Sequence, residues 1–108
     1  MGVTSELEIA VLTATFDAAP GGEEALLSAL SRYVVMTRRE PACRNVDLVA
    51  SVTQGGRFLV IEKWDSPEAV QTHLDSRLMT DMARDVLPSL AQQPALDLFD
   101  SISAHDLA

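Results

Sequence analysis

The sequence of 108 residues predicts an α+β protein of the ferredoxin-like type, with strands and helices in the order βαββαβ. Three observations lead to this prediction. Four segments have the composition and alternation of strands, two have apolar residues at helical spacing, and turn signals rich in Gly, Pro and Asp separate them. This order predicts an antiparallel four-stranded sheet with both helices on one face.

The first strand is predicted at residues 7–16, because this run of Val, Ile, Leu and Thr stops at the turn sequence DAAPGG. The first helix is predicted at residues 23–38, where apolar residues recur every three or four positions. Glu23 and Glu24 suit the positive end of its dipole. Pro41 marks the region where the helix has ended.

A β-hairpin is predicted next, with strands at residues 45–53 and 57–64 joined by the turn sequence QGG. The second helix opens with Ser66 as N-cap and Pro67 at its first position, and its apolar pattern extends to about residue 91. The phase of that pattern shifts near residues 75–77, which predicts a bent or two-piece helix. The fourth strand is predicted at residues 95–103, followed by a loose tail.

Neither face of the predicted first strand is plainly polar. Ile9 and Val11 point to one side, whereas Ala10, Leu12, Ala14 and Phe16 point to the other. A sheet with helices on one face only should present a polar second face. We therefore expect the second face to be buried against another copy of the chain in a homodimer.

The charge of the chain excludes some classes of binding partner. The chain carries 8 Lys and Arg against 16 Asp and Glu, a net charge of −8, and its basic residues form no stripe. Nucleic acids and membrane surfaces are therefore not expected as partners.

The length predicts a single domain over residues 1–108 with a core at about 7–103. No run is long enough to span a membrane and the N-terminus has no signal-peptide pattern, so a cytoplasmic protein is expected.

The sequence contains no glycine-rich phosphate loop, no nucleophile elbow and no cluster with metal-ligand spacing, so neither a cofactor nor a metal is expected. Cys43 is the single cysteine, and its simplest interpretation is a small buried hydrophobic residue rather than a reactive thiol.

His73 is the first candidate for chemistry. It lies at the edge of the apolar stripe of the second helix, three residues after Val70. One interpretation is a structural histidine at the boundary of the core, and the other is a general base facing a cavity. The second histidine, His105, falls in the predicted tail, where a solvated role is expected.

Glu62 shares one strand face with Phe58, Val60 and Trp64, because side chains alternate with a period of two. A carboxyl group in such an apolar row lies at an exposed strand end, pairs with a cation or sits in a pocket. Trp64 either packs in the core or lines a cavity. Asn45, at the start of the second strand, is a turn-end polar residue or a ligand contact.

Two segments resemble the antibiotic biosynthesis monooxygenase family. Residues 58–74, FLVIEKWDSPEAVQTHL, are similar to its strand ending in Glu-x-Trp, which leads into a helix with a His nine residues after the Trp. Residues 37–48, TRREPACRNVDL, are similar to its Arg-x-Glu-Pro-Gly-Cys turn into the second strand, although Ala42 replaces the usual Gly. The resemblance extends over about residues 9–99.

The resemblance implies a dimeric α+β barrel, in which two sheets pack face to face, and a cavity between each sheet and its helices. It also implies oxygenation of a small phenolic or quinol-type aromatic by molecular oxygen without a cofactor. His73 and Glu62 are then the expected catalytic residues, and Trp64, Asn45 and Phe58 the expected substrate contacts. Ala83 and Arg84 stand where haem-degrading relatives carry a haem-binding His, so haem degradation is not expected.

Two alternatives to the monooxygenase remain open on the sequence. An isomerase of a small keto compound would use His73 for proton transfer in the same cavity. A dimeric ligand-binding or stress-response protein without catalysis would use His73 only to close the fold.

Overall fold

The computed structural model describes residues 8–103 and confirms the ferredoxin-like α+β fold. Its elements, in chain order, are β1 (Ala10–Asp17), α1 (Glu23–Thr37), β2 (Cys43–Ala50), β3 (Arg57–Trp64), α2 (Pro67–Leu74), α3 (Arg77–Val86), the short 3-10 helix η2 (Leu87–Ser89) and β4 (Ala95–Asp100). Part of the predicted first strand, including Leu7, and the predicted tail with His105 lie outside the described residues.

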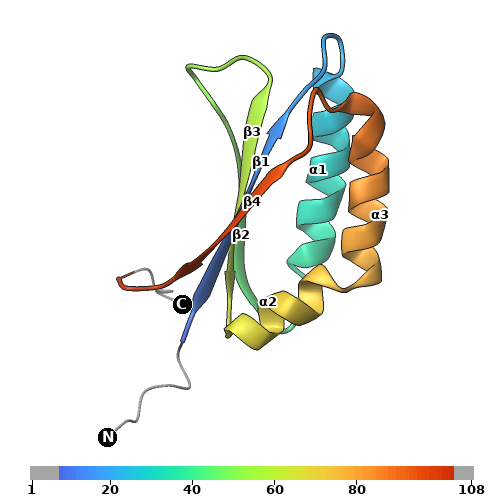
Figure 1. The fold of residues 1–108 in the computed structure, drawn as a ribbon. Coiled ribbons are helices and arrows are strands. Elements are labelled where there is room, and N and C mark those ends of the chain that lie inside the picture. The colour runs from blue at the N-terminus through green and yellow to red at the C-terminus, as the bar shows by residue number, and fades with distance from the viewer. Residues whose placement is uncertain (1–7, 104–108) are drawn as a thin grey trace, which may run out of the picture.

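The four strands form one antiparallel sheet in the order β2-β3-β1-β4. Helices α1, α2 and α3 all lie on one side of this sheet, and the described part of the chain leaves the other side open (Figure 1). The two strands at the centre, β1 and β3, pair along their whole length, from Ala10 opposite Trp64 to Asp17 opposite Arg57. Residues opposite one another share a face, so this register decides which side chains meet beneath the helices.

The helix-facing rows of the central strands form the core. Ala10, Leu12, Ala14 and Phe16 of β1 are at most 4% exposed, and they lie beside Trp64, Glu62, Val60 and Phe58 of β3. Apolar residues of α1 cover this row, among them Leu26, Leu30 and Tyr33. The alternation seen in the sequence of β1 is thus the alternation between the core and the open face.

The turn before α1 requires glycine at two consecutive positions. Gly21 has a φ of +80°, which side chains with a Cβ rarely adopt. At Gly22 a Cβ atom would lie 3.0 Å from the carbonyl oxygen of Ser89, so a larger residue would require the backbone of η2 to shift. Gly21 and Gly22 therefore allow the start of α1 to pack closely against η2.

The predicted break in the second helical segment is confirmed, and serine caps explain it. Ser66 accepts a hydrogen bond from the backbone N–H of Ala69 at the start of α2. Ser76, between the two helices, likewise accepts one from the N–H of Met79 at the start of α3. A second cap ten residues after the first begins a new helix in a new direction.

Several predicted ends were wrong by a few residues. The second helical segment was predicted to reach residue 91, but α3 ends at Val86 and continues only as η2, because Pro88 has no N–H to donate. Strand β2 runs over Cys43–Ala50 instead of residues 45–53, since the Ser51 hydroxyl accepts the N–H groups of Thr53 and Gln54 and turns the chain. Strand β4 ends at Asp100 rather than residue 103.

The open face of the sheet carries an apolar stripe between polar residues. Its apolar members come from all four strands and are half-buried or exposed: Val11, Val49, Leu59, Ile61 and Phe99. Phe99 and Val49 are 46% and 43% exposed, respectively. This composition agrees with the expectation that the second face is not plainly polar.

We expect Leu30→Ala in α1 to lower the free energy of unfolding by about 2–5 kcal/mol, because the fully buried side chain leaves a cavity in the core. Leu27→Ala on the same helix is the control, since Leu27 is 43% exposed, and should cost less than about 1 kcal/mol. Urea unfolding measures both. Equal losses would contradict the described packing of α1.

Candidate active site

Glu62 is a carboxyl group inside the core. It is 1% exposed and lies on the helix-facing side of β3, opposite Leu12 on β1 and Val46 on β2. Two side chains donate hydrogen bonds to it. The indole Nε1 of Trp64 lies 2.9 Å from Oε1, and the hydroxyl of Tyr33 lies 2.6 Å from Oε2. Glu62 is therefore not at an exposed strand end, and the two side chains that donate to it are uncharged rather than an Arg.

His73 lies on the other side of the Tyr33 hydroxyl. Its Nε2 atom is 2.6 Å from the Tyr33 oxygen and 3.6 Å from Oε1 of Glu62. Its Nδ1 atom is 2.9 Å from Oε2 of Glu40, in the connection between α1 and β2. The imidazole ring also packs against the indole of Trp64, with ring centroids 4.5 Å apart. Both ring nitrogens therefore have partners, and His73 is 1% exposed.

Each residue of this network reaches the centre because its element presents it there. Tyr33 is on the sheet-facing side of α1, Glu62 and Trp64 alternate inward on β3, and His73 is in the last turn of α2. Together with Glu40, these five residues are called the buried network below. Burial is the common feature, since only Glu40 has an appreciably exposed side chain, at 30%.

Burial changes the acidity of two members of the network. It raises the pKa of Glu62 above its usual range, against the lowering effect of the hydrogen bonds from Tyr33 and Trp64 and of the nearby His73. It also raises the pKa of Tyr33 strongly, and the Glu62 carboxylate beside the hydroxyl raises it further. Tyr33 therefore acts as a neutral phenol, whereas Glu62 is a carboxyl group that holds its proton more firmly than an exposed one.

The structure brings together three of the five predicted site residues: His73, Glu62 and Trp64. Phe58 is buried on the same face of β3 but four residues before Glu62, in the apolar cluster under α1. Asn45 is exposed on the open face and bonds to Asp47. An irregularity in the pairing of β2 between Cys43 and Asn45 sets this phase, with Val46 inward and Asn45 outward. Contact of Phe58 or Asn45 with a substrate stays a prediction.

Sequence reasoning missed Tyr33 and Glu40. Tyr33 is the single tyrosine of the chain, and its position in the apolar stripe of α1 indicated only that it was buried. Glu40 lies in a loop, where nothing in the pattern distinguishes it from an exposed acid. A buried tyrosine needs a hydrogen-bond partner for its hydroxyl, and that requirement was the one available signal.

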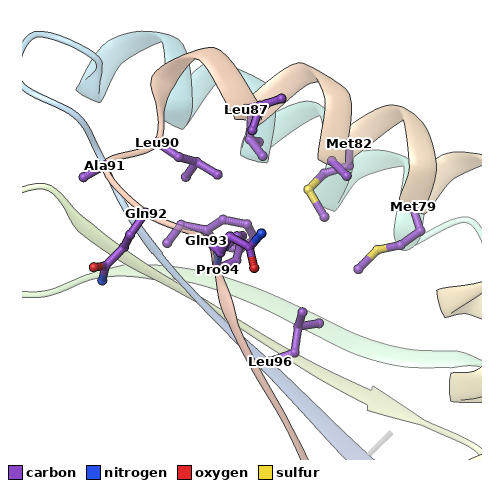
Figure 2. A pocket seen from close by; sticks show the side chains of 12 residues that line it. Met79, Met82, Leu87, Leu90, Ala91, Gln92, Gln93, Pro94 and Leu96 are labelled. Carbon is purple, nitrogen blue, oxygen red and sulfur yellow. The ribbon is translucent and has the colours of Figure 1, made fainter.

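An apolar cavity lies elsewhere, beside α3 and η2. It has a volume of about 410 Å³ and is bounded by Phe16 of β1, by one side of α3 and η2, and by the segment leading into β4. Figure 2 shows Met79 and Met82 above this cavity and Leu96 below it, with Gln92 and Gln93 at one end. Its walls are almost entirely apolar.

A smaller hollow of about 260 Å³ shares Met79 and Leu96 with the cavity. Its other walls include Leu74, which follows His73 on α2, and Leu12, which is paired with Glu62. Glu62, His73 and Trp64 line neither the hollow nor the cavity, and the network meets the hollow only through these two leucines.

Among residues 8–103, no helix is long and apolar enough to cross a membrane. Within the same range, no group of three or more His, Cys, Asp and Glu side chains is arranged to hold a metal ion. Cys43 is half-buried at the start of β2, and burial raises the pKa of its thiol to about 11, so it is protonated at neutral pH.

We expect the unfolding free energy to fall as the pH rises above about 4.3, the ordinary pKa of Glu, because the folded protein retains a proton on Glu62 that the unfolded chain releases. One such proton accounts for at most about 1.4 kcal/mol per pH unit. Glu62→Gln should weaken this dependence, since an amide carries no charge.

Urea unfolding over a pH series measures the effect, and Glu68→Gln, which changes an exposed Glu on α2, is the matched control. If Glu62→Gln and the wild type lose stability equally with rising pH, burial of Glu62 is not the cause.

Comparison with known proteins identifies the family. The antibiotic biosynthesis monooxygenase family matches residues 9–85. No curated protein sequence matches the chain. Among solved structures, the chain is similar to Rv0793 from Mycobacterium tuberculosis, with 24% identity over 91% of this chain and 99% of that one and a TM-score of 0.83.

It is also similar to PA3566 from Pseudomonas aeruginosa, with 28% identity over 91% of this chain and 98% of that one and a TM-score of 0.80. A third structure, described as an antibiotic biosynthesis monooxygenase, shares 24% identity over 86% of this chain and 98% of that one, with a TM-score of 0.78. With a family match over most of its length, the chain belongs to the antibiotic biosynthesis monooxygenase family.

Proposed function

We propose that the protein is a cofactor-independent monooxygenase that oxidises a small phenolic or quinol-type aromatic with molecular oxygen. Membership of the family supports a monooxygenase at the level of reaction class. The observation that carries the proposal is the buried network of Glu62, Tyr33 and His73, which lies next to an apolar hollow and cavity. A proton acceptor near an apolar space that can hold an aromatic ring is the combination this reaction needs.

The proposed reaction removes a proton from a substrate hydroxyl, and the resulting anion passes an electron to oxygen. For a hydroquinone, one oxygen atom enters the ring and the other leaves as water, which carries away two hydrogen atoms of the substrate. The product is a hydroxyquinone, and the substrate itself supplies both electrons that reduce the second oxygen atom. The protein needs to bind the aromatic ring, accept the proton and exclude bulk water.

Each part of the structure suits one of these tasks. The methionine and leucine side chains around the cavity offer an apolar, adaptable surface to an aromatic ring. Burial raises the pKa of Glu62, which makes its carboxylate a stronger base than an exposed one. His73 is proposed as the base or as the partner of the substrate anion, and Trp64 fixes the orientation of Glu62 and His73 through its indole.

A second candidate function follows from the hydrogen bonding of His73. Both of its ring nitrogens have partners within the chain, which is also what a purely structural histidine shows. In that case the protein is a ligand-binding protein without catalysis, and the network only fastens α1 and α2 to the sheet. The isomerase alternative uses the same groups for proton transfer and does not consume oxygen.

We also propose that the protein is a homodimer in which the open faces of two sheets pack together. The apolar stripe of Val11, Val49, Leu59, Ile61 and Phe99 supports this, because a monomer would leave it in contact with water. The net charge of −8 keeps such a dimer soluble.

We expect a panel of hydroquinones and phenols to include a substrate whose oxidation consumes oxygen and incorporates one atom of isotopically labelled O2, as seen by mass spectrometry. His73→Gln should lower kcat/KM by about 10²–10⁴-fold, the usual contribution of a general base. His105→Gln, which changes the other histidine, is the control and should keep full activity.

The same panel separates the alternatives. Hydrogen–deuterium exchange at a substrate carbon without oxygen consumption would replace the monooxygenase by the isomerase. Ligand-induced thermal stabilisation without turnover of any compound would favour the binding protein. A large loss of stability in His73→Ala together with no response to any ligand would favour a purely structural His73.

We expect Ile61→Asp, at the centre of the open face, to convert the dimer into a folded monomer, because the charge would be buried in the interface without a partner. Val35→Asp on the outer side of α1, where the residue is 51% exposed, is the control and should leave the dimer intact. Analytical ultracentrifugation measures both, and a wild-type chain that sediments as a monomer would contradict the proposal.

A further inference from the structure

Four ionisable side chains of the buried network form a continuous chain of contacts. Oε2 of Glu62 lies 2.6 Å from the Tyr33 oxygen, which lies 2.6 Å from Nε2 of His73, and Nδ1 of His73 lies 2.9 Å from Oε2 of Glu40. At these distances each contact holds one hydrogen atom between its two heavy atoms, since two lone pairs would repel. Three contacts therefore hold three protons.

Those three protons have more than one arrangement. When Tyr33 donates to Glu62, Nε2 of His73 donates to Tyr33 and Nδ1 donates to Glu40, so His73 is an imidazolium between two carboxylates. When Glu62 carries a proton and donates to Tyr33, Tyr33 donates to Nε2, and His73 is neutral. Both arrangements hold three protons and a net charge of −1, and they interconvert by two short proton transfers through Tyr33.

The two ends of the chain differ in their access to water. Side-chain exposure is 2% for Glu62 and 0% for His73, but 30% for Glu40, which lies in the loop before β2. Protons can therefore enter and leave at Glu40. We propose that Glu40, His73 and Tyr33 form a proton wire that connects solvent with the buried carboxyl group of Glu62, with Tyr33 as its relay.

The surroundings of the wire include one other hydroxyl beside Tyr33, that of the fully buried Thr37, which can accept a hydrogen bond from it. The indole N–H of Trp64 is a donor only and holds Oε1 of Glu62. Cys43 lies near both carboxyl groups, and burial keeps its thiol protonated at neutral pH. Arg38, which follows the end of α1, is a nearby cation, and its guanidinium donates a hydrogen bond to the carbonyl oxygen of Val46 at 2.9 Å. His73 also faces Glu62 directly, with Nε2 3.6 Å from Oε1, but this distance is too long for a hydrogen bond, so the hydrogen-bonded path runs through Tyr33.

The wire would return Glu62 to its reactive state after each substrate proton has been accepted, without opening the core to water. This use in turnover rests on the proposed function. The position of the proton in the resting protein does not depend on the proposed function. A test of that position therefore distinguishes failure of the wire from failure of the monooxygenase proposal.

The decisive variant is Glu40→Gln, which keeps an oxygen acceptor for Nδ1 but removes the charge that stabilises an imidazolium. The wire predicts that the proton then moves from His73 through Tyr33 to Glu62. Direct electrostatics predicts the opposite, because the negative charge of Glu40 raises the pKa of Glu62 and its removal would favour the carboxylate. The sign of the change therefore separates the two explanations.

The protonation change is measured by nuclear magnetic resonance at neutral pH. The side-chain carboxyl carbons of Glu and the ring nitrogens of His are isotopically labelled. We expect Glu40→Gln to shift the Glu62 carbon toward the signal of a protonated carboxyl, and Nε2 of His73 toward that of an unprotonated nitrogen. In the Tyr33→Phe background the Glu62 shift should disappear, because the hydroxyl that couples Glu62 to His73 is gone, whereas His73 still responds to the loss of the Glu40 charge beside its Nδ1. His105→Gln identifies the signals of His73, and Glu68→Gln is the matched control.

A Glu62 signal that moves toward the carboxylate, or does not move, in Glu40→Gln overturns the wire. An equal Glu62 shift with and without the Tyr33 hydroxyl overturns the role of Tyr33 as relay. Glu40 is partly exposed, so the Glu40→Gln result is obtained even if Tyr33→Phe does not fold.

Once a substrate is known, Tyr33→Phe and Glu40→Gln should each lower kcat about tenfold or more with little change in KM, because they slow proton return and not binding. Unchanged kcat in both variants, with the magnetic resonance signature intact, would overturn the use of the wire in turnover.

Discussion

The burial of one carboxyl group determines how this molecule is assembled around its site. Glu62 stands in the middle of an apolar strand row and cannot be removed from water without donors. Tyr33 on α1 and Trp64 on β3 supply them, His73 on α2 satisfies the other side of Tyr33, and Glu40 satisfies the other side of His73. Two helices, a central strand and a loop are thus tied to one position, and losing any donor would leave a buried polar group unpaired.

This arrangement favours function over stability. An apolar residue at position 62 would fit the surrounding row of Leu12, Val46 and Val60 and would need no partners. The chain instead holds a carboxyl group whose pKa burial raises, next to a phenol and an imidazole. Groups of this kind, packed within hydrogen-bond distance of each other, are typical of sites that move protons. The apolar cavity nearby provides volume for a molecule on which they could act.

The edge of the sheet limits the enclosure of that cavity. Strand β4 pairs only with β1, and its helix-facing residues Leu96 and Leu98 are 50% and 52% exposed, with Leu96 separated from α3 by the cavity. The cavity is therefore bounded on one side by a strand that the described part of the chain leaves largely uncovered. The opposite face of the same sheet carries the apolar stripe described above. Both surfaces of β4 thus have partly exposed apolar residues, which fits a protein that associates through this sheet.

The sequence by itself determined the element order, the helix break at Ser76 and the row shared by Glu62 and Trp64, because alternation, helical spacing and capping are local properties. It also indicated His73, through a motif shared with the family. Only the tertiary structure decided that Tyr33 and Glu40 join these residues, since α1 and the loop after it meet β3 and α2 by packing that no local pattern records. It likewise decided that Asn45 faces away from the site and that the apolar cavity lies beside α3. Distance along the chain hides such contacts: Tyr33 precedes its partner His73 by 40 residues, and the fold alone brings them within hydrogen-bond reach.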